Sequence, residues 1–199
     1  MFGNIASQII GYYLIAAVLI VVGYGQLKLR RWVRKLSLAL LWFWLVAGGA
    51  LITVIFFILS ATKELSYAVS LFTLIILGLC YFVFPWLLIK FYSSQESKEI
   101  FSTKDVKHYW TDNISPKLIA LSLLYFFYIV TLHILILFKG IYPVFGIFVC
   151  GIDGIYLIDI SIMCLACLIW GTLRQRLWAW WGGVIFIGLF TVSIVVTFL

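Results

Sequence analysis

Long, uninterrupted apolar runs are the feature that most constrains this chain. Each run holds roughly 20 residues or more, which is the length of helix that crosses the apolar core of a bilayer, about 30 Å thick. The runs cover Ile9 to Leu27, Leu36 to Ala61, Leu65 to Ile89, Leu118 to Phe138, Val144 to Trp170 and Leu177 to Leu199. They do not alternate as membrane β-strands do, so helices are predicted. The predicted fold class is therefore all-α, a polytopic transmembrane bundle of six spans.

Composition supports the same class. Hydrophobic residues make up 65% of the chain and charged residues 11%, and the mean hydropathy is +1.19. A soluble domain carries about a quarter charged residues. We therefore predict a single membrane domain over residues 1–199 whose surroundings are the lipid bilayer. The net charge of +7 is explained by orientation and acidic lipids, so it does not indicate nucleic-acid binding.

Basic residues alternate between the two predicted sides of the membrane. The connector at residues 90–117 carries five lysines, whereas the opposite side has only Lys63 and Lys139. The other anchors on the basic side are Lys28, Arg30, Arg31, Arg34, Lys35, Arg174 and Arg176. Positive charge is retained in the cytoplasm, so both termini are predicted to lie outside. The predicted location is the cytoplasmic (inner) membrane of a bacterium.

Two of the basic turns resemble each other. GQLKLRRW at residues 25–32 and GTLRQRLW at residues 171–178 share glycine, leucine, two basic residues and tryptophan at matching positions. A duplicated hairpin is one interpretation. We favour a simpler one, in which both are helix turns leaving the bilayer with snorkelling arginines and an interfacial tryptophan. The similarity does not extend into the flanking spans.

The connector at residues 90–117 is the only substantial segment outside the predicted spans. Ser93 and Glu96 have the spacing of a capping box, which predicts a short helix here. Apolar residues such as Ile100 and Phe101 lie among its charges. The segment is therefore expected to lie on the membrane surface or to dock under the bundle. It is a candidate partner-binding surface, although a simple connector is the favoured interpretation.

Two aspartates, Asp153 and Asp159, interrupt the fifth apolar run. An ionised aspartate at the centre of a span costs roughly 2.5–3.5 kcal/mol on insertion scales, so each is expected to be protonated, paired or in contact with water. Asp159 lies about 120° around the helix from Asp153, so the two cannot form a paired acid site. His133 is the nearest candidate partner, because a short connection makes the fourth and fifth spans antiparallel neighbours.

Asp153 shares its face of the fifth helix with small residues. They are Gly146, Cys150, Gly154, Ser161 and Cys164. Small side chains let membrane helices approach closely, so this face is predicted to be buried in the bundle. Gly48–Gly49 and Gly182–Gly183 are likewise predicted to be close-packing points.

Other chemistry is sparse. The sequence shows no nucleophile beside a base, no glycine-rich phosphate loop and no metal-ligand spacing. Cys164 and Cys167 lie three apart on a predicted membrane helix, which favours packing over redox chemistry. No metal or cofactor is predicted, and an enzyme is disfavoured.

The predicted function is a non-catalytic interaction or assembly subunit of a membrane complex. Its partner would be another membrane protein or a second copy of the chain. The alternative is a small transporter or channel, with Asp153 and Asp159 lining a proton or cation route. Ionisable groups inside a membrane occur in both classes.

Overall fold

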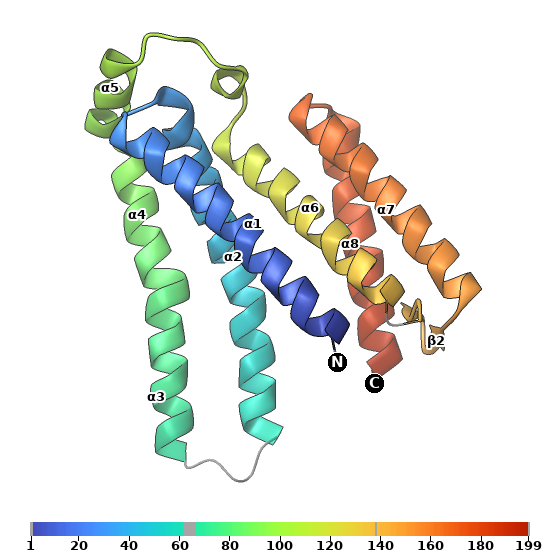
Figure 1. The fold of residues 1–199 in the computed structure, drawn as a ribbon. Coiled ribbons are helices and arrows are strands. Elements are labelled where there is room, and N and C mark those ends of the chain that lie inside the picture. The colour runs from blue at the N-terminus through green and yellow to red at the C-terminus, as the bar shows by residue number, and fades with distance from the viewer. Residues whose placement is uncertain (1, 62–66, 138, 199) are drawn as a thin grey trace. The chain divides into compact units, whose positions relative to one another are not determined.

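The computed structural model describes residues 2–61, 67–137 and 139–198, and these residues are almost entirely helical (Figure 1). Five helices are long and apolar enough to cross a membrane, namely Arg31–Phe56, Tyr67–Ser93, Pro116–Leu137, Ile152–Leu173 and Leu177–Thr197. The described apolar part of the first helix, Ala16–Leu27, is shorter. An all-helical, multi-pass architecture is thus confirmed, while the count of six spans stays a prediction. Lys63 and Glu64 lie outside the described residues.

The chain divides into two compact units, Met1–Pro116 and Lys117–Leu199, which we call unit 1 and unit 2. Unit 1 holds α1 (Phe2–Leu27), α2 (Arg31–Ala61), α3 (Tyr67–Gly78), the π-helical turn η1 (Leu79–Val83), α4 (Phe84–Ser93), α5 (Gln95–Lys104) and the 3₁₀ turn η2 (Trp110–Asn113). Unit 2 holds α6 (Pro116–Leu137), β1 (Tyr142–Val144), β2 (Ile147–Val149), α7 (Ile152–Leu173) and α8 (Leu177–Phe198). Two such units can belong to one membrane domain, so that prediction stays open.

In unit 1, α3 and α4 form one helix that is widened by the π-helical turn η1. Pro85 is the second residue of α4, just after this turn, and is fully buried. Proline lacks an N–H and its ring clashes with the carbonyl four residues before it, which a wider turn relieves. Helix α2 packs closely here, because a Cβ on Gly48 would lie 2.6 Å from Cδ1 of Tyr81, whereas one on Gly49 would have 3.7 Å to its nearest neighbour. The close-packing prediction for this pair is confirmed, chiefly by Gly48.

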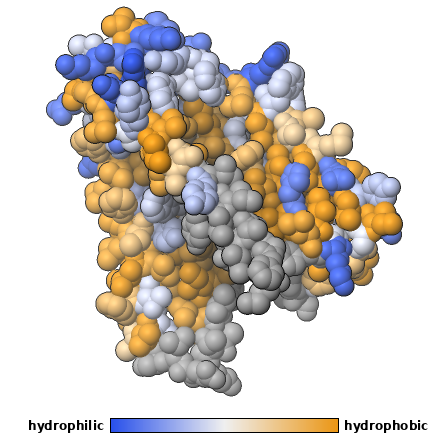
Figure 2. All heavy atoms as spheres, in the orientation of Figure 1, coloured by the Kyte–Doolittle hydropathy of each residue, from blue (hydrophilic) through white to orange (hydrophobic). Residues whose placement is uncertain are grey.

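The connector between α4 and α6 docks onto unit 1. Phe101 of α5 is 7% exposed and packs in a cluster with Val22 and Val33. The residue that caps α5 is Ser94, whose hydroxyl accepts a hydrogen bond from the Ser97 N–H at 3.2 Å. This corrects the predicted cap at Ser93, because α4 continues through that residue and the backbone becomes extended only at the next one. Figure 2 shows hydrophobic residues along the helices of unit 1 and hydrophilic residues gathered at the end that carries α5.

The fifth apolar run is not one helix. In unit 2 its first part forms a short antiparallel hairpin of β1 and β2, and α7 begins at Ile152 instead of the predicted Val144. Phe145 and Gly146 form the tight turn with positive φ values of 37° and 101°. Ser193 of α8 holds the hairpin, because its hydroxyl donates to the Pro143 carbonyl at 2.8 Å and accepts from the Phe145 N–H at 3.1 Å. Hydropathy alone does not distinguish such a hairpin from a helix.

The three helices of unit 2 pack around one small core. Its buried members are Tyr125, Leu132, Ile158, Leu165, Leu168 and Ala179. A Cβ on Gly183 would overlap the Tyr125 side chain, and one on Gly182 would lie 3.1 Å from Leu168. The predicted close packing at this glycine pair is confirmed.

The turn between α1 and α2 has a specific backbone structure. The Arg30 N–H donates to the Gly25 carbonyl at 2.9 Å, and Leu29 adopts a positive φ of 48°. Helix α2 begins at the next residue, Arg31. Glycine is needed at position 25 because a Cβ there would overlap the buried Val33 side chain.

The turn between α7 and α8 repeats this structure bond for bond. The Arg176 N–H donates to the Gly171 carbonyl at 2.9 Å, Gln175 has a φ of 55°, and α8 begins at Leu177. The other turn bonds also match in position. For example, the Ala179 N–H donates to the Arg176 carbonyl, as the Val33 N–H donates to the Arg30 carbonyl. The resemblance between the two octapeptides therefore extends to their backbone geometry, which the interpretation as two unrelated interfacial turns did not anticipate.

Candidate functional sites

A buried carboxylate joins the connector to the first basic turn of unit 1. Asp105 is 4% exposed. Its Oδ2 accepts hydrogen bonds from the Arg31 N–H and the Tyr109 hydroxyl, both at 3.1 Å, and its Oδ1 lies 3.6 Å from Nη1 of Arg30. The carboxylate therefore sits at the N-terminus of α2, where unpaired N–H groups and the helix dipole favour negative charge.

The surroundings of Asp105 determine its protonation. Burial alone would raise the pKa of this carboxyl, but hydrogen bonds from the Arg31 N–H, the Tyr109 hydroxyl and the Lys107 N–H, together with the Arg30 guanidinium, bring the pKa below its usual range. Burial and the neighbouring carboxylate raise the pKa of Tyr109. At neutral pH the aspartate is thus ionised and the tyrosine keeps the proton that it donates.

A second aspartate of the connector, Asp112, binds the same basic turn. Its Oδ1 lies 3.6 Å from Nε of Arg31 and 3.9 Å from Nζ of Lys35, and its Oδ2 lies 3.7 Å from Nδ1 of His108. Lys35 also donates to the Thr111 carbonyl at 2.9 Å. Together, Asp105 and Asp112 hold the connector against the α1–α2 turn.

Sequence reasoning missed this junction. It interpreted Arg30, Arg31 and Lys35 only as anchors near lipid headgroups. The unused signal was that the acidic residues of the connector and the basic turn were predicted to lie on the same side of the membrane. The Arg34 side chain also binds the protein and not only lipid headgroups, because its Nη1 donates to the Tyr92 carbonyl at 3.0 Å.

Asp153 lies in the first turn of α7 and not in the middle of a longer helix. Because the hairpin takes up the first part of the apolar run, this exposed carboxylate lies at a helix start, where the helix dipole favours it. His133 is also exposed, and its Nδ1 is hydrogen-bonded to the Ile129 carbonyl of its own helix at 2.8 Å. Within the described part of the chain, no hydrogen bond or ion pair joins Asp153 to His133. The candidate contact between Asp153 and His133 is therefore not formed.

Asp159 lies inside α7, about 10 Å from its start in a helix about 33 Å long. It is exposed, and among the described residues it has no hydrogen-bond or ion-pair partner. Gly154 and Ser161 occupy the opposite, buried side of the helix. Asp159 therefore points away from the core that α7 forms with α6 and α8.

The structure separates the residues of the predicted small-residue stripe. Gly146 lies in the hairpin turn, Cys150 lies between β2 and α7, and Cys164 is exposed. Gly154 and Ser161 do face the packed side. A Cβ on Gly154 would overlap the Gly140 carbonyl oxygen, and the Ser161 hydroxyl is 2.8 Å from the Tyr142 hydroxyl. These two residues fasten α7 to the segment before it.

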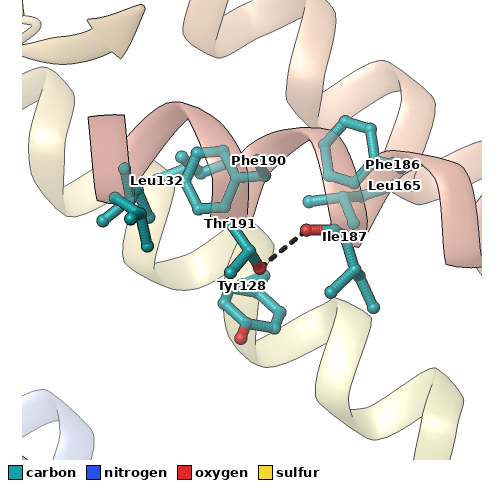
Figure 3. A pocket seen from close by; sticks show the side chains of 9 residues that line it. Tyr128, Leu132, Leu165, Phe186, Ile187, Phe190 and Thr191 are labelled. Atoms are coloured by element: carbon teal, nitrogen blue, oxygen red, sulfur yellow. Dashed lines mark hydrogen bonds between the residues drawn. The ribbon is translucent and has the colours of Figure 1, made fainter. Parts of the chain in front are cut away.

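Unit 2 also encloses a small cavity of about 160 Å³ between its helices (Figure 3). Its walls are largely apolar, and the Thr191 hydroxyl at its edge already donates to the Ile187 carbonyl at 2.8 Å. Neither Asp153 nor Asp159 lines it. The cavity therefore offers no continuation of a proton route from these carboxylates. In the described ranges, no three histidine, cysteine or acidic residues gather as they would for a metal ion.

Comparison of this chain with family models, with curated proteins and with solved structures found no match. Its function is therefore inferred from the residues and their geometry. Two features place charged or hydrogen-bonding groups where they can make specific contacts. They are the exposed Asp159 on α7 and the carboxylates held by the α1–α2 turn.

Proposed function

We propose that the protein is a non-catalytic assembly subunit of a membrane-protein complex and that it binds its partner through α7. The observation that carries this proposal is the seam of α7, a line of exposed residues spaced alternately by four and three positions. The seam consists of Ile152, Tyr156, Asp159, Met163, Ala166 and Trp170. Ile152 is 72%, Tyr156 64% and Met163 69% exposed. This spacing is that of side chains that pack between two helices.

Asp159 lies near the centre of the seam, and its charge supports a protein partner over lipid. An aspartate that faces lipid costs roughly 2.5–3.5 kcal/mol on insertion scales, whereas a donor or cation on a neighbouring helix offsets that cost. All 14 lysines and arginines of this chain lie at or beyond the ends of its apolar runs. The group that pairs with Asp159 is therefore expected to come from another chain.

A single polar residue in an apolar seam also sets which partner is accepted and in what register. Ala166 supports the same role, because a small side chain allows a second helix to approach closely. In this proposal the basic turns and the connector face the cytoplasm of a bacterium, and both termini lie outside the inner membrane, as the distribution of positive charge indicates.

The test is copurification from native membranes. The tagged chain is extracted in nanodiscs, and proteins present at a fixed ratio are identified. Wild type and Ile160→Ala are expected to retain the partner, because Ile160 is exposed but lies off the seam. Asp159→Leu and Met163→Ala should lower the amount of partner at least several-fold.

Two outcomes would count against the proposal. One is a chain that purifies alone, and the other is an Asp159→Leu variant that retains its partner at the wild-type ratio. Either result would favour the transport alternative. Asp153→Asn and Asp159→Asn would then be assayed for proton-coupled flux in liposomes.

A further inference from the structure

The charge of Asp159 constrains what kind of helix can cover the seam of α7. The side chain is exposed, about 10 Å along a helix that is about 33 Å long, and no described residue forms a hydrogen bond or an ion pair with it. Its neighbours in the seam, one turn away on either side, are Tyr156 and Met163. An ionised carboxylate at this depth therefore needs a partner that supplies both hydrogen-bond donors and positive charge.

A lysine or an arginine meets this requirement better than a neutral donor does. A hydrogen bond with an ionised donor and an ionised acceptor is shorter and stronger than one between neutral groups. A neutral donor would also leave the charge of the carboxylate without a counter-charge in apolar surroundings, where an unpaired charge is costly. Charge complementarity therefore favours a cation on the partner helix, at the same depth as Asp159.

A second copy of this chain fits the seam less well. All copies insert in the same direction, so a symmetric dimer formed by α7 has its two-fold axis along the membrane normal. Each Asp159 would then lie beside its own copy, and two adjacent carboxylates disfavour each other's ionised form. The lysines and arginines of the chain lie at or beyond the ends of its apolar runs. The cation is therefore expected on a different protein.

The surface beside the seam offers a second contact. An open, apolar groove of about 590 Å³ lies between α7 and α8, along about 12 Å of α7. Its lining includes the exposed Cys164 and Cys167 of α7 and Gly182 of α8. Met163 belongs both to the seam and to the lining of the groove, so the two surfaces are continuous. A helix that pairs with Asp159 lies over α7 and brings its neighbouring apolar side chains to this groove.

We propose that the partner of α7 is a transmembrane helix of a different protein, which carries a lysine or an arginine level with Asp159 and places a large apolar side chain in the groove. This inference rests on the proposed function and defines its partner by chemistry. The two contacts together fix the register of the partner helix. The cation sets its depth, and the apolar side chain lies nearer to the α7–α8 turn.

The test uses the full chain in phosphatidylcholine nanodiscs and three fluorescent probe helices. Each probe is a leucine-rich transmembrane peptide, and the three differ only at one position level with Asp159, which is lysine, glutamine or leucine. The lysine peptide should bind at least about tenfold more tightly than the glutamine peptide, because only the lysine pairs with the carboxylate. Asp159→Asn should abolish this difference, whereas Asp159→Glu should preserve it.

Three further variants separate the two contacts from general effects. Asp153→Asn removes the same charge about 9 Å away along α7 and on another face, and should change the affinity for the lysine peptide by less than about twofold. Cys164→Phe fills the groove and leaves Asp159 in place, and should weaken binding of the lysine peptide several-fold. Ile160→Ala only enlarges the groove and should have little effect.

Copurification from native membranes separates this inference from the proposed function. The inference is supported if Asp159→Glu retains the partner, Asp159→Asn loses it, and the partner has a lysine or an arginine at the matching level of a transmembrane span. A partner that Asp159→Asn retains would contradict the cationic helix alone. A chain that purifies without a partner would contradict both proposals.

Two other results would overturn the inference. One is equal affinity of the wild-type chain for the lysine and glutamine peptides. The other is pairing of α7 with a second copy, detected by cross-linking in a background without native cysteines. Asp159→Cys would then cross-link to itself in a symmetric dimer, or to His133→Cys of another copy in a head-to-tail contact, since His133 is also exposed.

Discussion

Replacing Asp105 with alanine should release the connector from unit 1. The carboxylate accepts two hydrogen bonds of 3.1 Å, from the Arg31 N–H and the Tyr109 hydroxyl, and a longer one of 3.3 Å from the Lys107 N–H. A hydrogen bond to a charged group contributes about 1.5–3 kcal/mol. The ion pair with Arg30 adds about 0–1 kcal/mol, because that side chain is 49% exposed. At the low end of these ranges the two shorter bonds together stabilise the docked connector by about 3 kcal/mol.

Hydrogen exchange measures this change directly, because undocking of the connector is a local opening. A loss of about 3 kcal/mol raises the open population roughly 150-fold. The amides of residues 105–113 in Asp105→Ala should therefore exchange about 100-fold faster than in wild type, with α7 unchanged. Glu99→Gln is the control, since Glu99 is an exposed carboxylate that accepts from Gln95 at 3.1 Å on the same helix. An acceleration below about fivefold in Asp105→Ala would refute the reasoning.

Acid should weaken the docking of the connector on the α1–α2 turn. The pKa of Asp105 is lowered in the folded protein, so its stabilisation is complete above the ordinary value of about 3.9 and is lost as the pH falls through the lower folded value. After correction for intrinsic exchange, protection of the connector should be constant from about pH 7 to pH 5 and should fall below about pH 4. Protection that stays unchanged below about pH 4 would contradict the assigned hydrogen bonds.

Three further predictions follow from packing and topology. Gly48→Ala should lower the thermal unfolding temperature in detergent, because the new methyl would lie 2.6 Å from a side-chain atom of the π-helical turn, whereas Gly49→Ala, with 3.7 Å of room, should be tolerated. Gly154→Ala should reduce the yield of folded protein because its methyl would overlap a backbone oxygen, while Gly188→Ala, with nothing within 4 Å, should be neutral or stabilising by up to about 1 kcal/mol. In a background without native cysteines, Gln95→Cys should react with an impermeant thiol reagent only after the cells are opened, and labelling in intact cells would reverse the proposed orientation.

The hairpin of unit 2 shows where sequence reasoning loses accuracy. Residues 142–149 are as apolar as a membrane helix, and the run was therefore predicted to be helical from Val144. The chain departs from a helix here because Gly140, Gly146 and Gly151 all adopt positive φ values and because Ser193 of α8 holds the hairpin. The last contact joins residues 50 positions apart. Periodicity and hydropathy do not report such distant partners.

The contacts of the candidate residues could not be predicted from the sequence for a related reason. The sequence singles out Asp159 as a candidate residue, but whether it faces the core or the outside depends on which side α6 and α8 cover. The partners of Arg31, the Asp105 and Asp112 carboxylates, lie more than 70 residues away along the chain. Residue types and spacing identify groups that need partners, and only the packing of the helices shows which groups meet.

The amino-acid sequence by itself determined the class of this protein and most of its helices. An apolar helix satisfies its own backbone hydrogen bonds, so its formation is a local property that hydropathy records. The shared backbone of the two basic turns is local too, because it depends on residues within one octapeptide and its neighbours. Only the tertiary structure decided that the connector closes the α1–α2 turn and that Asp159 points away from the core of unit 2. Those features depend on contacts between distant segments, which no short stretch of sequence contains.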